Sequence, residues 1–173
     1  MDRILAMIPL KDGHAFKSEV LRGLCKQTVP VDIMAVSRPK SERHRNIPAG
    51  YISMSECRNI AKEEGLEQYN SEYFLLLNRD VVLKRDTDIE DMINFLQFNR
   101  DFGAVAINTR KKEIRLLVDN THTDIACMVI RRSILEKITF HNEKHCNCRC
   151  VCGYIRSNGL SVGYIDHRKC PEI

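Results

Sequence analysis

The side chains best suited to chemistry are Asn78, Arg79 and Asp80, which follow directly on the apolar run 73–77. A carboxylate such as that of Asp80 is a preferred ligand of hard divalent cations, and a bound cation can hold phosphate oxygens. The ordinary alternative is that Asp80 opens a turn, as Asp often does. This stretch alone does not choose between a metal site and a turn.

A second group of reactive side chains lies near the C-terminal end. Its members are His141, His145, Cys146, Cys148, Cys150 and Cys152. Thiolates and imidazoles are the usual ligands of tetrahedral zinc, but the usual spacing is C-x-x-C rather than C-x-C. On a helix, with about 100° per residue, only Cys146 with Cys150 and Cys148 with Cys152 share a face. A zinc site, disulfides that include Cys170, and buried thiols all stay open, with buried thiols as the default.

The elements around Asp80 read as an α/β fold. The run 73–77 is typical of a strand buried on both faces of a parallel sheet, and ligands of open α/β sheets bind at the carboxyl ends of such strands. Strands are also expected at 4–8 and 31–36, with helices at 16–25 and from the capping box 53–56 onward. Alternating strands and helices predict parallel βαβ units.

The second half of the chain has a more mixed pattern. A helix is expected after a second capping box, Thr87–Glu90, with a buried stripe formed by Ile89, Met92, Ile93 and Leu96. The other expected elements are strands at 104–107, 114–118, 125–130 and 160–165, a short helix at 133–136, and a helix ending before Gly159. We therefore predict one α/β domain with a central, mostly parallel mixed sheet flanked by helices.

Composition limits the function classes. A chain of 173 residues and 20.0 kDa fits one domain, and its net charge of +4 favours anionic ligands such as nucleotides without indicating nucleic acid. No stretch approaches the roughly 20 apolar residues of a membrane span, and the apolar start 1–9 is too short for a secretory signal. We expect a cytoplasmic protein. Cys25, Cys57 and Cys127 lie among apolar residues and are expected in the core.

The order of several motifs resembles that of the GT-A glycosyltransferases, most closely the family 2-like members. Residues 21–36 are similar to the pattern L-x-S-L-x-x-Q-T-x-P-x-x-I-x-V-V, and residues 71–80 to G-E-Y-I-x-F-L-D-x-D. Further similar segments are Ile8-Pro9, the A-R-N-like helix 55–61, the R-R segment 127–138 and the R-x-x-G segment 156–167. The resemblance covers nearly the whole chain. It implies a nucleotide-binding α/β fold that transfers a sugar from a nucleotide-activated donor to an acceptor hydroxyl.

The resemblance also implies site residues. Asp80 falls on the last Asp of the family's DxD motif, which ligates Mn²⁺ or Mg²⁺, and His167 falls where some members complete the metal shell. Asn78 falls on the first Asp of that motif, near the donor ribose. Four further positions correspond to the family's nucleotide site: Pro9, Leu10, Ser37 and Arg58. For Arg58, the alternative is a structural side chain that anchors a loop.

Three departures from the family pattern affect the mechanism. Asn78 and Ser37 stand where most members have Asp, and Asn147-Cys148 stand where inverting members have an acidic pair that includes the general base. Glu143 is our candidate for that base, and His145, Asp124 and Asp119 also lie near enough in the sequence to substitute for it. A displaced base, a retaining enzyme and a lapsed catalyst all stay open.

We therefore predict a metal-dependent glycosyltransferase with a nucleotide-binding half, 1–83, and an acceptor-side half, 84–173. Its expected partners are a nucleotide-sugar donor and an acceptor that the sequence does not identify, with self-association left open. Three alternatives are a non-catalytic module on the same scaffold, a zinc-stabilised interaction protein, and a nucleotidyltransferase. The last would need a glycine- and basic-rich phosphate loop after the first strand, and residues 10–14 are a poor version of one.

Overall fold

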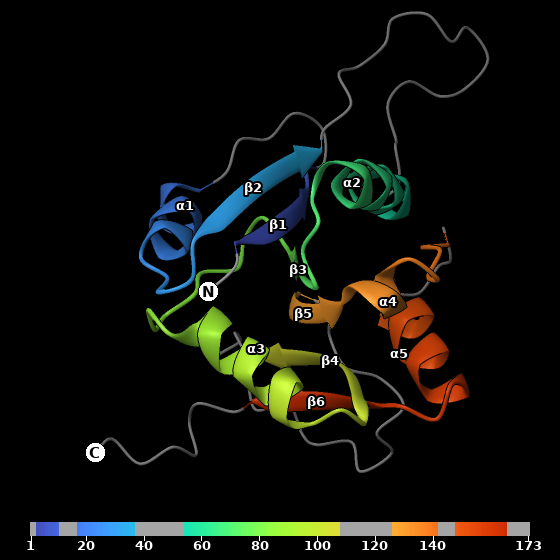
Figure 1. Ribbon diagram of the computed structural model, residues 1–173. Helices are drawn as coiled ribbons and strands as arrows, with labels where there is room; N and C mark the ends of the chain where they lie inside the picture. Colours follow the sequence, from blue (N-terminus) through green and yellow to red (C-terminus); the bar gives the residue numbers. More distant parts are fainter. Residues whose placement is uncertain (1–2, 11–16, 37–53, 108–125, 142–147, 166–173) are drawn as a thin grey trace, which may run out of the picture.

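The computed structural model describes residues 3–10, 17–36, 54–107, 126–141 and 148–165. These form six strands and five helices (Figure 1). In chain order they are β1 (Ile4–Pro9), α1 (Ser18–Cys25), β2 (Val31–Val36), α2 (Met54–Gln68), β3 (Tyr73–Leu77), α3 (Asp88–Phe98), β4 (Phe102–Ile107), β5 (Cys127–Arg131), α4 (Arg132–Leu135), α5 (Cys148–Ser157) and β6 (Ser161–Ile165). The expected strand 114–118, His145 and Ser53 of the first capping box lie outside the described residues.

All six strands form one sheet in the order β2-β1-β3-β5-β4-β6. Strand β1 pairs in parallel with β2 and β3, and β4 pairs in parallel with β6. Strand β5 runs antiparallel between β3 and β4. The predicted fold class, an α/β domain with a mostly parallel mixed sheet, is confirmed.

Helices cover both faces of the sheet, which gives three layers (Figure 1). Because successive side chains of a strand point to opposite faces, each strand contributes to two separate cores. One core contains Ile4, Leu75 and Val129 and is closed by α1 and α3. The other contains Leu5 and Phe74 and is closed by α2, α4 and α5.

Strand β3 is the central element and carries the residues of greatest interest at its end. It lies between β1 and β5, and all five of its side chains are buried. The prediction that 73–77 is an interior strand is therefore confirmed. Because helices pack on both faces of the sheet, only the ends of this strand can reach the surface.

Two expectations are wrong. Cys25 is exposed rather than in the core, because α1 turns the face of Val20, Gly23 and Leu24 inward. The capping box at Thr87–Glu90 does not form, since the Thr87 side chain makes no capping hydrogen bond.

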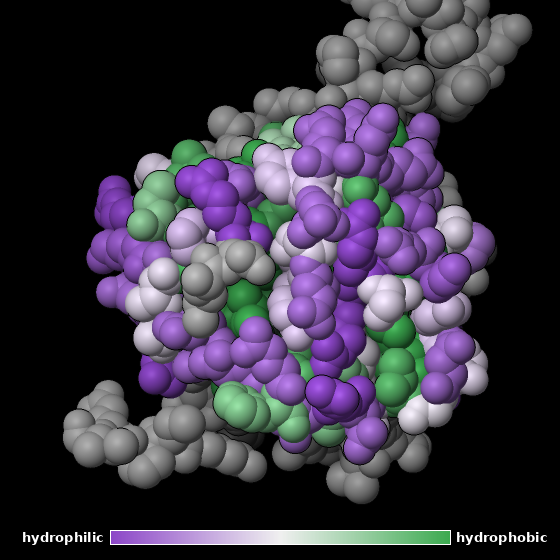
Figure 2. All heavy atoms as spheres, in the orientation of Figure 1, coloured by the Kyte–Doolittle hydropathy of each residue, from purple (hydrophilic) through white to green (hydrophobic). Residues whose placement is uncertain are grey.

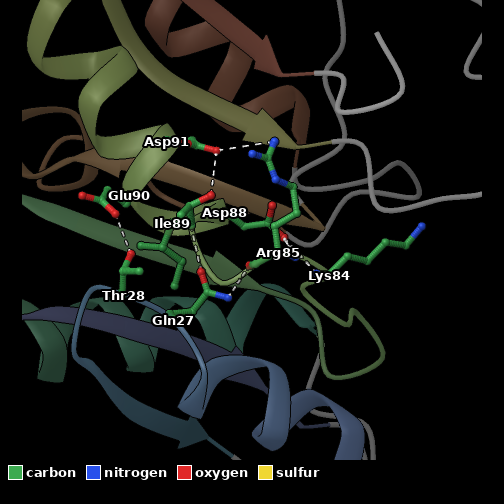
Figure 3. Close-up of polar contacts among 9 residues, drawn as sticks. Gln27, Thr28, Lys84, Arg85, Asp88, Ile89, Glu90 and Asp91 are labelled. Atoms are coloured by element: carbon green, nitrogen blue, oxygen red, sulfur yellow. Dashed lines mark hydrogen bonds and ion pairs between the residues drawn. The ribbon is translucent and has the colours of Figure 1, made fainter. Parts of the chain in front are cut away.

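The start of α3 is instead held by Gln27, which follows α1, and by Asp88, the first residue of α3 (Figure 3). The Oε1 atom of Gln27 accepts the Ile89 amide at 3.0 Å, and its Nε2 atom donates to the carbonyl of Arg85 at 2.9 Å. The Oδ2 atom of Asp88 accepts the amides of Lys84 and Arg85 at 2.9 and 3.1 Å. Gln27 thus joins the end of α1 to the start of α3.

The described surface is largely hydrophilic on the face shown in Figure 2, where hydrophobic residues show mainly in gaps between polar ones. Among the described residues, no helix combines the length and the apolar character needed to cross a membrane.

Candidate functional site

The carboxyl ends of three parallel strands meet at one edge of the sheet. Pro9, the last residue of β1, pairs with Val36, the last residue of β2, and the Leu10 amide donates to the Val36 carbonyl at 2.8 Å. Helix α2 connects β2 to the parallel strand β3, so it begins at this edge and runs back along the sheet. The first two turns of α2 and the residues after β3 are therefore neighbours.

Asp80 lies in a turn directly after β3. Asn78 opens this turn, and the Val81 amide donates to the Asn78 carbonyl at 3.2 Å. The Asp80 side chain is exposed and makes no hydrogen bond or ion pair with any residue in the described part of the chain. Its oxygens are therefore accessible to a hard cation at the carboxyl edge of the sheet.

Arg58 and Asn78 are in direct contact. The Nη2 atom of Arg58 donates to Oδ1 of Asn78 at 2.7 Å, and the Arg58 side chain is only 6% exposed. The Arg58 guanidinium also lies over the Phe140 ring, with Cζ 5.9 Å from the ring centroid. Arg58 thus ties α2 to the end of β3, a contact that fits the structural alternative and leaves its place near the nucleotide a prediction.

The other predicted site residues divide into two groups. Pro9 is buried in β1, and Leu10 packs against the core under α1 and α3. Ser37, Glu143 and His167 lie outside the described residues, as do Asp119, Asp124 and Asn147. The structure therefore brings Pro9, Leu10, Arg58, Asn78 and Asp80 to one edge of the sheet.

The cysteine cluster is only partly described. Cys150 is half-buried and Cys152 is buried on α5. Within the described ranges, no group of three His, Cys, Asp or Glu side chains could hold a metal ion. Cys146 and Cys170 lie outside those ranges. Cys127 is in the core as expected, and burial raises the pKa of its thiol.

The segment 138–141 lies along α2, a contact that was not expected from the sequence. Three side chains of α2 donate to its backbone: Ser55 to His141 at 2.8 Å, Asn59 to Phe140 at 2.9 Å and Lys62 to Ile138 at 2.9 Å. Residues spaced at i, i+4 and i+7 share one helix face. No signal in the sequence singles these three residues out, because most residues of α2 are polar.

Comparisons with protein-family models and with curated sequences gave no match. Solved structures do match. TarS 1–349 of S. aureus superposes with a TM-score of 0.64 at 16% identity, over 95% of this chain and 58% of that one. The mannosyltransferase PcManGT of Pyrobaculum calidifontis, solved with GDP-Man and Mn²⁺, gives 0.65 at 10% identity, over 95% of this chain and 55% of that one.

A synthetase that makes CMP:2-keto-3-deoxy-manno-octonic acid, solved with CTP, is less similar, with a TM-score of 0.54 at 9% identity, over 96% of this chain and 90% of that one. The chain thus has the GT-A fold of nucleotide-sugar glycosyltransferases, as expected from the motifs. It spans little more than half the length of the two glycosyltransferases named above.

Proposed function

We propose that this chain is a metal-dependent glycosyltransferase that moves a sugar from a nucleotide-sugar donor to an acceptor hydroxyl. The position of Asp80 carries the proposal. Its exposed carboxylate follows the central strand at the edge where β1 and β2 also end. Fold neighbours include a mannosyltransferase solved with GDP-Man and Mn²⁺ and TarS solved with UDP.

The donor set suits a hard cation. Asp80 supplies carboxylate oxygens that no described residue occupies, and oxygen is what Mn²⁺ and Mg²⁺ prefer. We assign Asp80 as the principal ligand and His167 as a second one. A cation held there would neutralise the diphosphate and stabilise the leaving nucleotide as its charge develops.

The remaining roles follow from position. Pro9, Leu10 and Ser37 would line the nucleoside site, because they end or follow β1 and β2 at the same edge. Asn78 would present its amide to the donor ribose while Arg58 fixes its orientation. Glu143 is the proposed general base that removes the proton of the acceptor. In this scheme 1–83 binds the nucleotide and 84–173 faces the acceptor.

A thermal-shift screen tests the proposal. UDP, GDP, CDP and CTP are each added with Mn²⁺, with Mg²⁺ or with EDTA, because a ligand that binds only the folded state raises the melting temperature. At a ligand concentration of 100 Kd, the stabilisation is about 2.7 kcal/mol. We expect a metal-dependent shift with at least one nucleoside diphosphate. The absence of any metal-dependent nucleotide shift would contradict the proposal.

Two outcomes of the screen separate the competing functions. A shift with CTP and none with the diphosphates would favour a nucleotidyltransferase like the CTP-bound neighbour. Metal-dependent donor binding without donor hydrolysis or transfer would favour a non-catalytic module on the same scaffold. Metal analysis of the purified protein covers the zinc alternative, because close to one equivalent of tightly held zinc would support it.

A further inference from the structure

Helix α2 connects two segments that are distant in the sequence. Ser55, Asn59 and Lys62 bind the segment 138–141. Arg58 binds Asn78, directly after β3. Asn59 makes the central contact with the segment: its Nδ2 atom donates to the Phe140 carbonyl and its Oδ1 atom accepts the Phe140 amide, both at 2.9 Å. A pair of hydrogen bonds to one residue fixes its register, whereas Ser55 and Lys62 each supply a single bond.

Phe140, which Asn59 holds in place, contacts the side chain of Arg58. Its ring is 2% exposed and lies against the Arg58 guanidinium, 5.9 Å from Cζ to the ring centroid. A cation over an aromatic face is attracted by the ring quadrupole, and the interaction strengthens when both partners are removed from water. Arg58 is therefore held between the Phe140 ring and the Asn78 amide.

Asn78 in turn fixes the turn that carries Asp80. Its side-chain oxygen accepts from Arg58. Its backbone carbonyl accepts the Val81 amide at 3.2 Å, and its backbone amide donates to the Ala126 carbonyl at 2.8 Å. The contacts therefore form a continuous series from Asn59 through Phe140, Arg58 and Asn78 to the turn. Asn59, Phe140, Arg58 and Asn78 are all wholly or half buried.

We propose that Asn59 is a positioning residue: by clamping Phe140 it holds Arg58 on Asn78 and so fixes the turn 78–81 at the carboxyl edge of the sheet. The role of Asn59 in cation and donor binding rests on the function proposed above. Its role in fixing the turn does not, and the two can be tested separately.

The test compares Asn59→Ala with Lys62→Met. Lys62 binds the same segment at its far end and makes no contact in the series, so Lys62→Met removes one segment contact and keeps the apolar stem. Hydrogen exchange of a peptide covering 78–83 reports the Val81 amide without any ligand. We expect Asn59→Ala to speed its exchange roughly tenfold, since both hydrogen bonds that fix Phe140 are lost. Lys62→Met should leave it unchanged.

The side-chain amide signals of Asn78 in an NMR spectrum provide a second readout. They should shift in Asn59→Ala and not in Lys62→Met, which a general loss of stability would not produce. Phe140→Leu retains an apolar side chain and removes the aromatic face, so it should reproduce both effects if Asn59→Ala fails to fold. Equal effects of the two α2 substitutions, or none at residues 78–81, would overturn the proposal.

Binding of UDP or GDP with Mn²⁺ to the same variants then tests the functional consequence. Asn59→Ala should weaken binding several-fold while Lys62→Met retains it. If the unmodified protein binds neither nucleotide but Asn59→Ala still loosens 78–81, the positioning role stands and the proposed function fails. If the protein binds nucleotide and Asn59→Ala changes neither the turn nor the affinity, the function stands and the positioning role fails.

Discussion

The Nη2 atom of Arg58 donates a 2.7 Å hydrogen bond to Oδ1 of Asn78, and this contact joins the start of α2 to the end of the central strand. Its donor is charged, and its acceptor is a neutral amide at a position where the resembled family has a carboxylate. The contact therefore orients Asn78 without neutralising Arg58.

Loss of this contact should cost more than loss of an exposed contact of similar length. Arg58→Met removes a hydrogen bond of a buried charged group, and we expect the free energy of unfolding to fall by about 2–3 kcal/mol. Arg3 donates to Asp32 at 2.8 Å with its side chain 68% exposed, so Arg3→Met should cost less than about 1 kcal/mol. Urea denaturation measures both. Equal losses would show that Arg58 is not an anchor.

Of Gln27 and Thr28, Gln27 should contribute more to the free energy of unfolding. Its side chain donates to Gly23 at 3.0 Å and to Arg85 at 2.9 Å and accepts the Ile89 amide at 3.0 Å. Gln27→Ala leaves these backbone groups without that partner and should cost about 2–3 kcal/mol. Thr28→Val removes one exposed bond to Glu90, of 2.7 Å, and should cost under about 1 kcal/mol. Thermal unfolding that ranks the two in the opposite order would contradict this assignment.

Two glycines should respond oppositely to a methyl group. A Cβ atom at Gly163 in β6 would overlap Cε1 and Cζ of Phe95, so Gly163→Ala should destabilise the protein by about 1–3 kcal/mol. Gly153 is exposed on α5, and a Cβ there would meet nothing within 4 Å. Gly153→Ala should stabilise by about 0.5–1 kcal/mol, because Ala favours helix. A destabilised Gly153→Ala would contradict the open space at Gly153, and a neutral Gly163→Ala would contradict the close contact with Phe95.

Cys127 should make the free energy of unfolding fall at alkaline pH. Burial raises the pKa of its thiol above the ordinary 9.0, so above that pH the unfolded chain loses a proton that the folded chain keeps. Stability is therefore fully present below pH 9 and should fall by about 1.4 kcal/mol per pH unit above it. Cys127→Ala should flatten this part of the profile. Identical slopes for both proteins between pH 9 and 10 would contradict it.

Hydrophobic patterns made most of the fold predictable. The apolar run 73–77 is typical of an interior strand, and the stripe at Ile89, Met92 and Leu96 has helical spacing; both lie in the core. The start of α3 was not predictable, because its amide partner Gln27 is 62 residues away in the sequence. Cys25 was misplaced because a helix turns about 100° per residue, so a neighbour of a core position can face solvent.

The candidate site was predictable where it depends on strand ends. Asp80 and Asn78 follow an unmistakable strand, and Pro9 ends another, so their shared edge follows from parallel pairing. The partner of Arg58 and the position of Phe140 over it depend on tertiary packing between distant segments, which no local pattern encodes.

Calorimetric titration of Mn²⁺ with a nucleoside diphosphate into Asp80→Ala and Asp86→Ala tests whether Asp80 is the principal metal ligand. Both residues are exposed carboxylates after β3, and neither side chain bonds a described residue, so the substitutions change net charge equally. We expect at least a tenfold loss of metal-dependent affinity in Asp80→Ala and none in Asp86→Ala. Undiminished Mn²⁺-dependent binding in Asp80→Ala would contradict it.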